Sequence, residues 1–137
     1  MSESDLWKHI KNNIGHRGHF SRVESHETSS GIPDVDYCID GVEGHMELKF
    51  AVNAAPKIRG TQVQWFRKRG KAKGNPWMFS HLVLHNKDYY LLHRTSAMID
   101  LAKQKDVSKW IGSAACIWVG FMDWHEFIKH LTMKGEK

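Results

Sequence analysis

The sequence lacks an apolar run long enough to form a membrane-spanning helix, so we expect no membrane partner. It also has few cysteines. The two it has, Cys38 and Cys116, are far apart, and each lies in an apolar run. We expect both to be reduced and buried in strands, without a disulfide or a metal site. No Gly-rich phosphate loop occurs, which predicts no nucleotide cofactor. The N-terminus has no charged-then-apolar signal pattern, which predicts a cytoplasmic protein.

One long segment contains no acidic residue. Between Phe50 and Lys87 there is no Asp or Glu, although the whole chain has 15 of them against 20 Lys and Arg. The formal net charge is +5 and the isoelectric point is about 9.3. A chain with this balance suits a polyanionic partner, of which nucleic acid is the best candidate once a membrane is set aside.

The length and composition predict one compact domain over residues 1–137, with 41% hydrophobic residues to form its core. Apolar periodicity and turn residues predict helices and strands in alternation. The expected strands are 20–24, 34–39, 42–51, 77–85, 89–92 and 115–119. The expected helices begin at Ser4 or Asp5, at Thr61 and at Thr95, and a last one carries Phe121, Trp124, Phe127, Ile128 and Leu131. This order predicts an α/β fold with a central mixed β-sheet flanked by helices.

The most informative feature is a predicted hairpin around Asp40-Gly41, a strong signal for a two-residue turn. Counting outward from that turn pairs Ile39 with Val42 and places Asp34 opposite Glu47. Side chains alternate between the two faces of a strand. One face therefore collects Val35, Tyr37, Ile39, Val42, Met46 and Leu48, and the other collects Asp34, Asp36, His45, Glu47 and Lys49.

Two carboxylates opposite each other repel and destabilise a sheet. Asp34 and Glu47 therefore need a compensating cation, and Mg²⁺ suits a site with one or two carboxylates and several waters. Lys49 points to the same side as Glu47, where it can orient or deprotonate an attacking water or balance charge on a phosphate. The alternative is a solvated strand face that carries mixed charges, and a register shifted by one residue would separate the cluster.

These residues resemble a known family. The run Gly31-Ile-Pro-Asp34 followed by Glu47-Leu-Lys49 resembles the signature of the PD-(D/E)XK nucleases, and it falls on a hairpin as in that family. The wider run from Arg22 to Trp65 is similar to small phage nucleases of the resolvase-like and VRR-NUC-like kinds. The resemblance implies a restriction-endonuclease-like core and metal-dependent hydrolysis of DNA to 5′-phosphate and 3′-hydroxyl ends. For a phage-encoded protein, the compartment would be the host cytoplasm.

The resemblance also implies individual roles. Asp34, Glu47 and the backbone carbonyl of Leu48 would bind Mg²⁺, which Mn²⁺ would replace. Lys49 would position the nucleophilic water, and Gln62 would reach a metal-bound water or the scissile phosphate. We favour Glu24 as the additional acidic ligand because it lies beside the Asp34 strand. The alternatives are Glu27 and Glu3, the latter on the N-terminal helix.

The acid-free segment begins directly after this cluster, which favours contact with DNA over a merely solvated helix and loop. The predicted phosphate-binding residues are Lys57, Arg59, Arg67, Lys68, Arg69, Lys71 and Lys73. Such contacts fix position rather than sequence. Trp77, just after the basic loop, is the aromatic residue that we expect to contact DNA. The ten histidines have no Cys pair at zinc-site spacing, so we predict no zinc site.

We therefore predict a structure-selective DNA endonuclease acting in recombination on branched DNA such as a four-way (Holliday) junction. A symmetric homodimer is expected, because two strands must be cut. The first alternative is a repair-type nicking or exonuclease-like nuclease acting on ends or flaps. The second is a basic DNA-binding module without catalysis.

Overall fold

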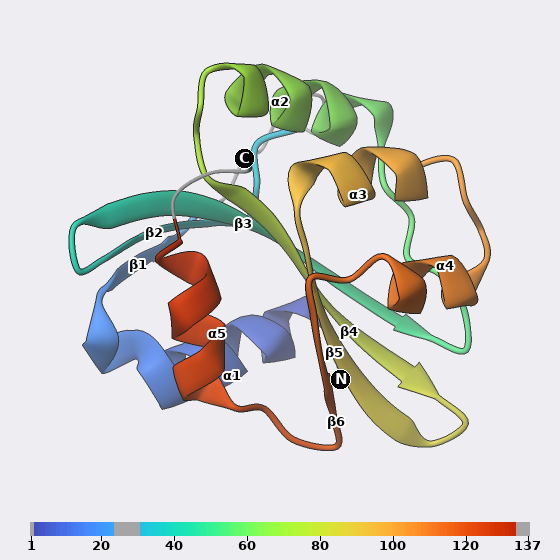
Figure 1. Cartoon of the computed structure of the whole chain (residues 1–137). Coiled ribbons are helices and arrows are strands. Elements are labelled where there is room, and N and C mark those ends of the chain that lie inside the picture. Colours follow the sequence, from blue (N-terminus) through green and yellow to red (C-terminus); the bar gives the residue numbers. More distant parts are fainter. Residues whose placement is uncertain (1, 24–30, 134–137) are drawn as a thin grey trace.

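The computed structural model describes residues 2–23 and 31–133, and in it one mixed six-stranded sheet carries the whole fold. The strands follow one another in chain order across the sheet (Figure 1). They are β1 (His19–Arg22), β2 (Val35–Ile39), β3 (Val42–Val52), β4 (Pro76–Leu84), β5 (Lys87–His93) and β6 (Cys116–Val119). Among the described strands, β3 and β4 pair in parallel and the other neighbouring pairs are antiparallel. The predicted α/β fold with a mixed sheet is confirmed.

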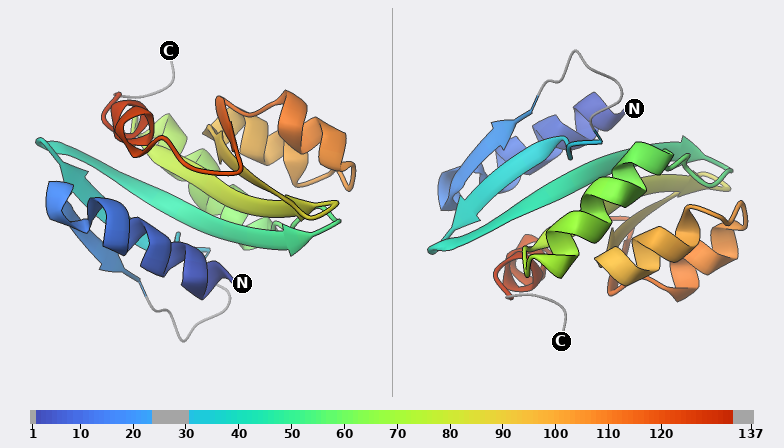
Figure 2. Two further views of the ribbon diagram at one scale, coloured as in Figure 1. Left: turned by 90° about the horizontal axis from the view of Figure 1, so that it is seen from below. Right: turned by 90° about the horizontal axis from the view of Figure 1, so that it is seen from above.

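Helices cover both faces of this sheet. They are α1 (Glu3–Ile14), followed by the short 3-10 helix η1 (Gly15–Arg17), then α2 (Gly60–Lys71), α3 (Thr95–Leu101), α4 (Val107–Gly112) and α5 (Trp124–Leu131). On one face α1 and α5 lie side by side, with His9 packed against Trp124. On the other face lie α2, α3 and α4, as the views in Figure 2 also show. The helix α2 is the crossover between the two parallel strands, which is the connection that such strands require.

The core is divided between the two faces in the same way. The first cluster joins α1, α5 and the apolar face of the β2–β3 hairpin, including Ile10, Leu48 and Phe127. The second joins α2, α3 and α4 to the opposite face, including Phe66 and Trp110. Both faces are therefore shielded from water, and this decides the environment of the polar residues on β3.

The predicted hairpin register is confirmed from Ile39–Val42 to Val35–Met46. The turn residues Asp40 and Gly41 have φ values of 51° and 79°, the left-handed backbone of a two-residue hairpin turn. The prediction was wrong at the strand start, because β2 begins at Val35. Asp34 therefore lies just outside the β2–β3 ladder, and its backbone carbonyl accepts a hydrogen bond of 2.7 Å from the Val23 N–H.

Other boundaries differ from the predictions. The second hairpin turns at His85-Asn86, with φ values of 50° and 65°, so β5 starts at Lys87, within the predicted turn. The helix α2 begins at Gly60, one residue before the predicted Thr61, and ends at Lys71. The helix α4 was not predicted, because its six residues are too short to show periodicity. The first strand is His19–Arg22.

Three expectations about single side chains were wrong. Trp77 is fully buried within β4 and cannot contact DNA. Phe121 is 80% exposed and precedes α5, so it is not part of the apolar stripe of that helix. Cys38 and Cys116 lie in strands and are free thiols as expected, but both are only partly buried. Among the described residues, no helix is long and apolar enough to span a membrane.

Candidate active site

Asp34 directly precedes β2, at the end of the β2–β3 ladder beyond which β3 continues. The last pair of the β2–β3 ladder is Val35–Met46, and Asp34 Oδ2 instead accepts a hydrogen bond of 2.8 Å from the backbone N–H of Leu48. The preceding turn brings the chain close to α2: Gly31 has φ +69°, and a Cβ there would collide with the backbone carbonyl of Thr61. Glycine at this position therefore lets the Asp34 segment pack against the first turn of α2.

Glu47 and Lys49 lie on the face of β3 that α2 covers. They are only 3% and 6% exposed, and Lys49 Nζ lies 3.6 Å from Glu47 Oε2. The ammonium also donates to the backbone carbonyl of Lys57 at 2.8 Å and to Gln62 Oε1 at 3.0 Å. The sequence correctly placed the two residues on one face, but the face is buried rather than solvated.

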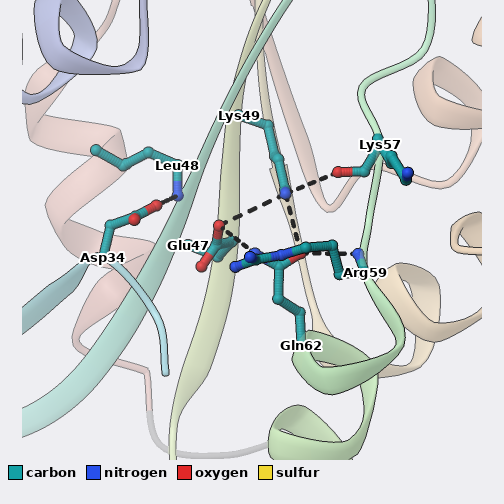
Figure 3. Close-up of polar contacts among 7 residues, drawn as sticks. All are labelled: Asp34, Glu47, Leu48, Lys49, Lys57, Arg59 and Gln62. Atoms are coloured by element: carbon teal, nitrogen blue, oxygen red, sulfur yellow. Dashed lines mark hydrogen bonds and ion pairs between the residues drawn. The ribbon is translucent and has the colours of Figure 1, made fainter. Parts of the chain in front are cut away.

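Gln62 joins these groups because of its position in α2. It is the third residue of the helix, and its Oε1 accepts the backbone N–H of Arg59 at 2.9 Å, which caps the helix start. The same side chain donates its Nε2 to Glu47 Oε2 at 3.0 Å. In Figure 3 Gln62, Lys49 and Glu47 point toward one another, while Asp34 reaches the Leu48 amide from the other side. The start of α2 and the polar face of β3 are therefore one connected network.

The electrostatics of Glu47 are unusual. Burial raises its pKa to about 8, with the neighbouring charge of Asp34 as the next cause and Lys49 acting in the opposite direction. Its second oxygen, Oε1, is buried without a hydrogen-bond partner among the described residues. A buried carboxylate with one unsatisfied oxygen costs free energy that a bound cation would recover.

The residues present fit a hard divalent cation. Within residues 2–23 and 31–133, no three His, Cys, Asp or Glu side chains are close enough together to hold a metal by themselves. Asp34 and Glu47 flank Leu48, however, and Mg²⁺ binds through one or two carboxylates and keeps several of its waters. The unsatisfied Oε1 of Glu47 is the oxygen that such an ion would use.

Glu3 is the acidic residue that the structure brings near this pair. Burial raises its pKa, the charge of Asp34 raises it further, and Lys49, Arg22 and Arg59 lower it. These interactions place the start of α1 beside the site, although Glu3 is far from Asp34 in sequence. The favoured candidate Glu24 and the alternative Glu27 lie outside the described residues.

His45 does not join the carboxylate pair. Its Nε2 lies 3.8 Å from Asp36, and its ring packs edge-on against Trp65 of α2 at 5.0 Å. The Arg69 guanidinium covers the Trp65 ring at 4.5 Å. Burial lowers the pKa of His45, and Arg69 lowers it further. His45 therefore packs beside the site, between the acidic Asp36 and the aromatic–cation pair of Trp65 and Arg69.

The predicted phosphate-binding residues lie on α2 and on the chain at its two ends. Arg69 is partly buried on Trp65, whereas the other cations are exposed: Lys57, Arg59, Arg67, Lys68, Lys71 and Lys73. The structure assigns Lys57 a contact that sequence patterns could not reveal, because its backbone carbonyl holds Lys49. Their role in DNA binding stays a prediction.

Comparison with known proteins identifies the fold. No protein-family model and no curated protein sequence matches the chain. The structure is similar to that of Hjc, a Holliday junction resolvase from the archaeal hyperthermophile Archaeoglobus fulgidus, with a TM-score of 0.56. The likeness covers 81% of this chain and 93% of that chain at 11% sequence identity. The chain has a resolvase-like α/β fold.

Proposed function

We propose that this protein is a Mg²⁺-dependent endonuclease that hydrolyses phosphodiester bonds in branched DNA such as four-way junctions. The observation that carries the proposal is Glu47: a buried carboxylate beside Asp34, with one oxygen unsatisfied and Lys49 held next to it. Most buried carboxylate oxygens have a hydrogen-bond partner, and a bound cation would supply one for Glu47 Oε1. The arrangement of Asp34, Glu47 and Lys49 suits a site that binds a cation and a phosphate.

Asp34, Glu47 and the backbone carbonyl of Leu48 would hold the metal, and Glu3 or Glu24 would supply an additional carboxylate. When bound, Mg²⁺ would lower the pKa of a coordinated water and offset the charge of the phosphate. Mn²⁺ is expected to substitute, since it accepts the same oxygen ligands.

The chain itself would contribute the positioned cation. Lys49 keeps its ammonium at one place because the Lys57 carbonyl and Gln62 Oε1 both accept from it. From there it would donate to the attacking water or to a non-bridging phosphate oxygen, where negative charge grows during in-line attack. Gln62 would act as a positioning residue that holds Lys49 and Glu47 in register. The products would be a 5′-phosphate and a 3′-hydroxyl.

Two observations favour a branched substrate. The fold resembles that of a solved Holliday junction resolvase. The basic residues near the site lie on one helix and its flanking loops, an arrangement suited to backbone contacts that read shape rather than base sequence. Cutting a junction requires two strand breaks, so we propose a symmetric homodimer with one site in each subunit.

The test is cleavage of an end-labelled four-way junction by the purified protein with Mg²⁺, with Mn²⁺ and with EDTA. We expect paired nicks near the branch point that require the metal and that Asp34→Asn abolishes. The matched control is Asp36→Asn, which removes an exposed carboxylate two residues away and should cut normally.

A 5′ flap and a linear duplex of the same sequence belong in the same assay. Preferential cutting of the flap or of duplex ends would identify a repair-type nuclease in place of a junction resolvase. If no substrate is cut with either metal, the chain is a non-catalytic DNA-binding module and the proposal is wrong.

A further inference from the structure

A basic pocket, separate from the Asp34 and Glu47 site, lies between the end of α2 and the start of α3. It is a pocket of about 460 Å³. Its polar and charged lining includes Arg67, Lys71, Lys73, Arg94, Thr95 and Ser96. None of the residues that line it is acidic. The pocket therefore gathers four cationic residues around one hollow.

Local backbone features keep this pocket open. Arg67 and Lys71 are one helical turn apart on α2, so they lie on the same side. The chain then turns sharply at Lys73, whose φ is +66°, and the Gly74 N–H returns to the Arg69 carbonyl at 2.9 Å. On the opposite wall, the Arg94 guanidinium lies over the buried Trp77 ring at 4.3 Å. That stacking holds Arg94 in place before any ligand arrives.

Glycines form part of the pocket surface. Gly70 and Gly74 both line it. A Cβ at Gly70 would meet the methyl group of Thr95 at 3.5 Å, and one at Gly74 would collide with the Arg69 side chain. Neither glycine adds a side chain to the pocket lining.

The pocket opens on a different side of α2 from the catalytic network. Gln62 points at Glu47 and Lys49, and Arg67 and Lys71 follow it by five and nine residues. At about 100° and 1.5 Å per residue, these two lie roughly 140–180° around the helix and about 8–14 Å along it. A second hollow of about 350 Å³ shares Arg67 and Ile99 and continues along α2 to Gly60. The two hollows therefore lie next to each other, on either side of Arg67 and Ile99.

We propose that this pocket binds a phosphate group of the bound DNA other than the one that is cut. The inference rests on the proposed function and extends it to a second contact point on the substrate. Guanidinium and ammonium groups with nearby hydroxyls match the charge and the oxygen geometry of a phosphate. The phosphate is either an internal phosphodiester or a 5′-terminal phosphate.

The first measurement is DNA affinity in EDTA, where no cutting occurs, by fluorescence anisotropy over a range of salt concentrations. The test variant is Arg67→Glu with Lys71→Glu. The matched control is Lys87→Glu with Lys109→Glu, which makes the same charge change at two exposed cations outside the pocket. We expect the test variant to weaken junction binding at least about tenfold and to reduce the log–log salt slope by about one, as for one lost phosphate contact. Equal weakening in the control would overturn the proposal, because it would reflect net charge alone.

The second measurement locates the ligand directly. Amide NMR spectra of the wild-type protein, titrated in EDTA with a tetranucleotide carrying a 5′-phosphate or a 5′-hydroxyl, should show shifts at Gly70, Gly74, Thr95 and Ser96. Larger shifts with the phosphorylated oligonucleotide assign the site to a terminal phosphate, and equal shifts assign it to an internal one. Absence of shifts at all four amides would overturn the proposal.

If the charge-reversal variant of the affinity measurement fails to fold, Arg67→Gln with Lys71→Gln takes its place.

These outcomes are separable from those of the nuclease proposal. Suppose that the amide signals of the pocket shift on addition of the oligonucleotide, but the protein cuts no DNA. That result would support the phosphate-binding proposal and overturn the nuclease proposal. Normal cutting by the wild-type protein, with unchanged junction affinity in the Arg67 and Lys71 variant, would overturn the pocket and leave the nuclease intact.

Discussion

On the α1–α5 face of the hairpin, Val35, Ile39, Met46 and Leu48 are fully buried and pack against apolar helices. On the α2 face, the adjacent residues Glu47 and Lys49 are almost equally buried, yet they rely on hydrogen bonds and an ion pair. The first face gains free energy from burial, about 25 cal/mol for each Å² of apolar surface removed from water. The second loses free energy to desolvation and recovers it incompletely, because Glu47 Oε1 has no hydrogen-bond partner among the described residues.

The two faces therefore differ in what burial contributes: the α1–α5 face adds to stability, and the α2 face holds the residues of the proposed active site. A buried ion pair often contributes less to stability than apolar residues of the same size would. The proposed function gives Glu47 and Lys49 a role that offsets this cost, namely contact with a metal ion and a phosphate. Opposite effects on stability and activity should follow when the two faces are altered in turn.

The largest effect is expected on catalytic activity, when a residue on the α2 face is substituted. Glu47→Gln removes a proposed metal ligand and should lower junction cleavage by at least about a thousandfold, the scale on which electrostatic groups contribute to transition-state stabilisation. Urea unfolding in EDTA should show no loss of stability, since an uncharged amide can still accept from Gln62. If Glu47→Gln cleaves the junction at a rate within tenfold of the wild-type protein, Glu47 is not a metal ligand.

The next largest effect is expected on the free energy of unfolding, when a core residue on the α1–α5 face is substituted. Phe79 is fully buried in β4 and packs against Phe127 at 4.6 Å. Phe79→Ala should lower the free energy of unfolding by about 3–5 kcal/mol because it leaves a cavity in the core. Phe121→Ala is the matched control: that ring is exposed, and its loss should change stability by less than about 0.5 kcal/mol. Similar losses from the two variants would contradict the assignment of the core.

The pH dependence of stability sharpens the comparison. The folded-state pKa of Glu47 is raised to about 8 from an ordinary 4.5, so its stabilising contribution is complete below pH 4.5 and is lost as the pH rises through 8. In EDTA, the wild-type protein should therefore lose a few kcal/mol relative to Glu47→Gln between pH 5 and pH 9. Unfolding curves for both proteins at several pH values measure this difference. Parallel pH profiles would show that the carboxyl ionises normally.

The smallest effect is expected from the link between the helix and the site. Gln62→Ala frees Lys49 and Glu47 from their shared partner while leaving both in place. Cleavage should fall about 10–100-fold, as for other residues that orient a metal-binding group. Gln62→Glu keeps an acceptor for Lys49 and the Arg59 amide but repels Glu47, so it should not restore activity. Full activity of Gln62→Ala would restrict its role to capping α2.

The hairpin was predictable from sequence because its signals are local. Asp40-Gly41 sets the turn, and strand alternation then assigns every side chain to a face. The same local reasoning put Asp34, Glu47 and Lys49 together. It failed at Trp77, where a basic loop suggested exposure, because burial depends on which helices cover the strand. It also gave no sign of Arg94, a single cation between a strand and a helix that only folding brings to Arg67.

By itself, the sequence determined the α/β fold, the register of the hairpin and the grouping of an acidic pair with a lysine. These follow from a two-residue period and a turn motif, both set by neighbours along the chain. Only the tertiary structure decided that α2 buries Glu47, that Gln62 holds it to Lys49 and that α1 brings Glu3 close. The physical reason is that desolvation and charge–charge interactions depend on groups distant in sequence, whose positions arise only when helices pack on the sheet.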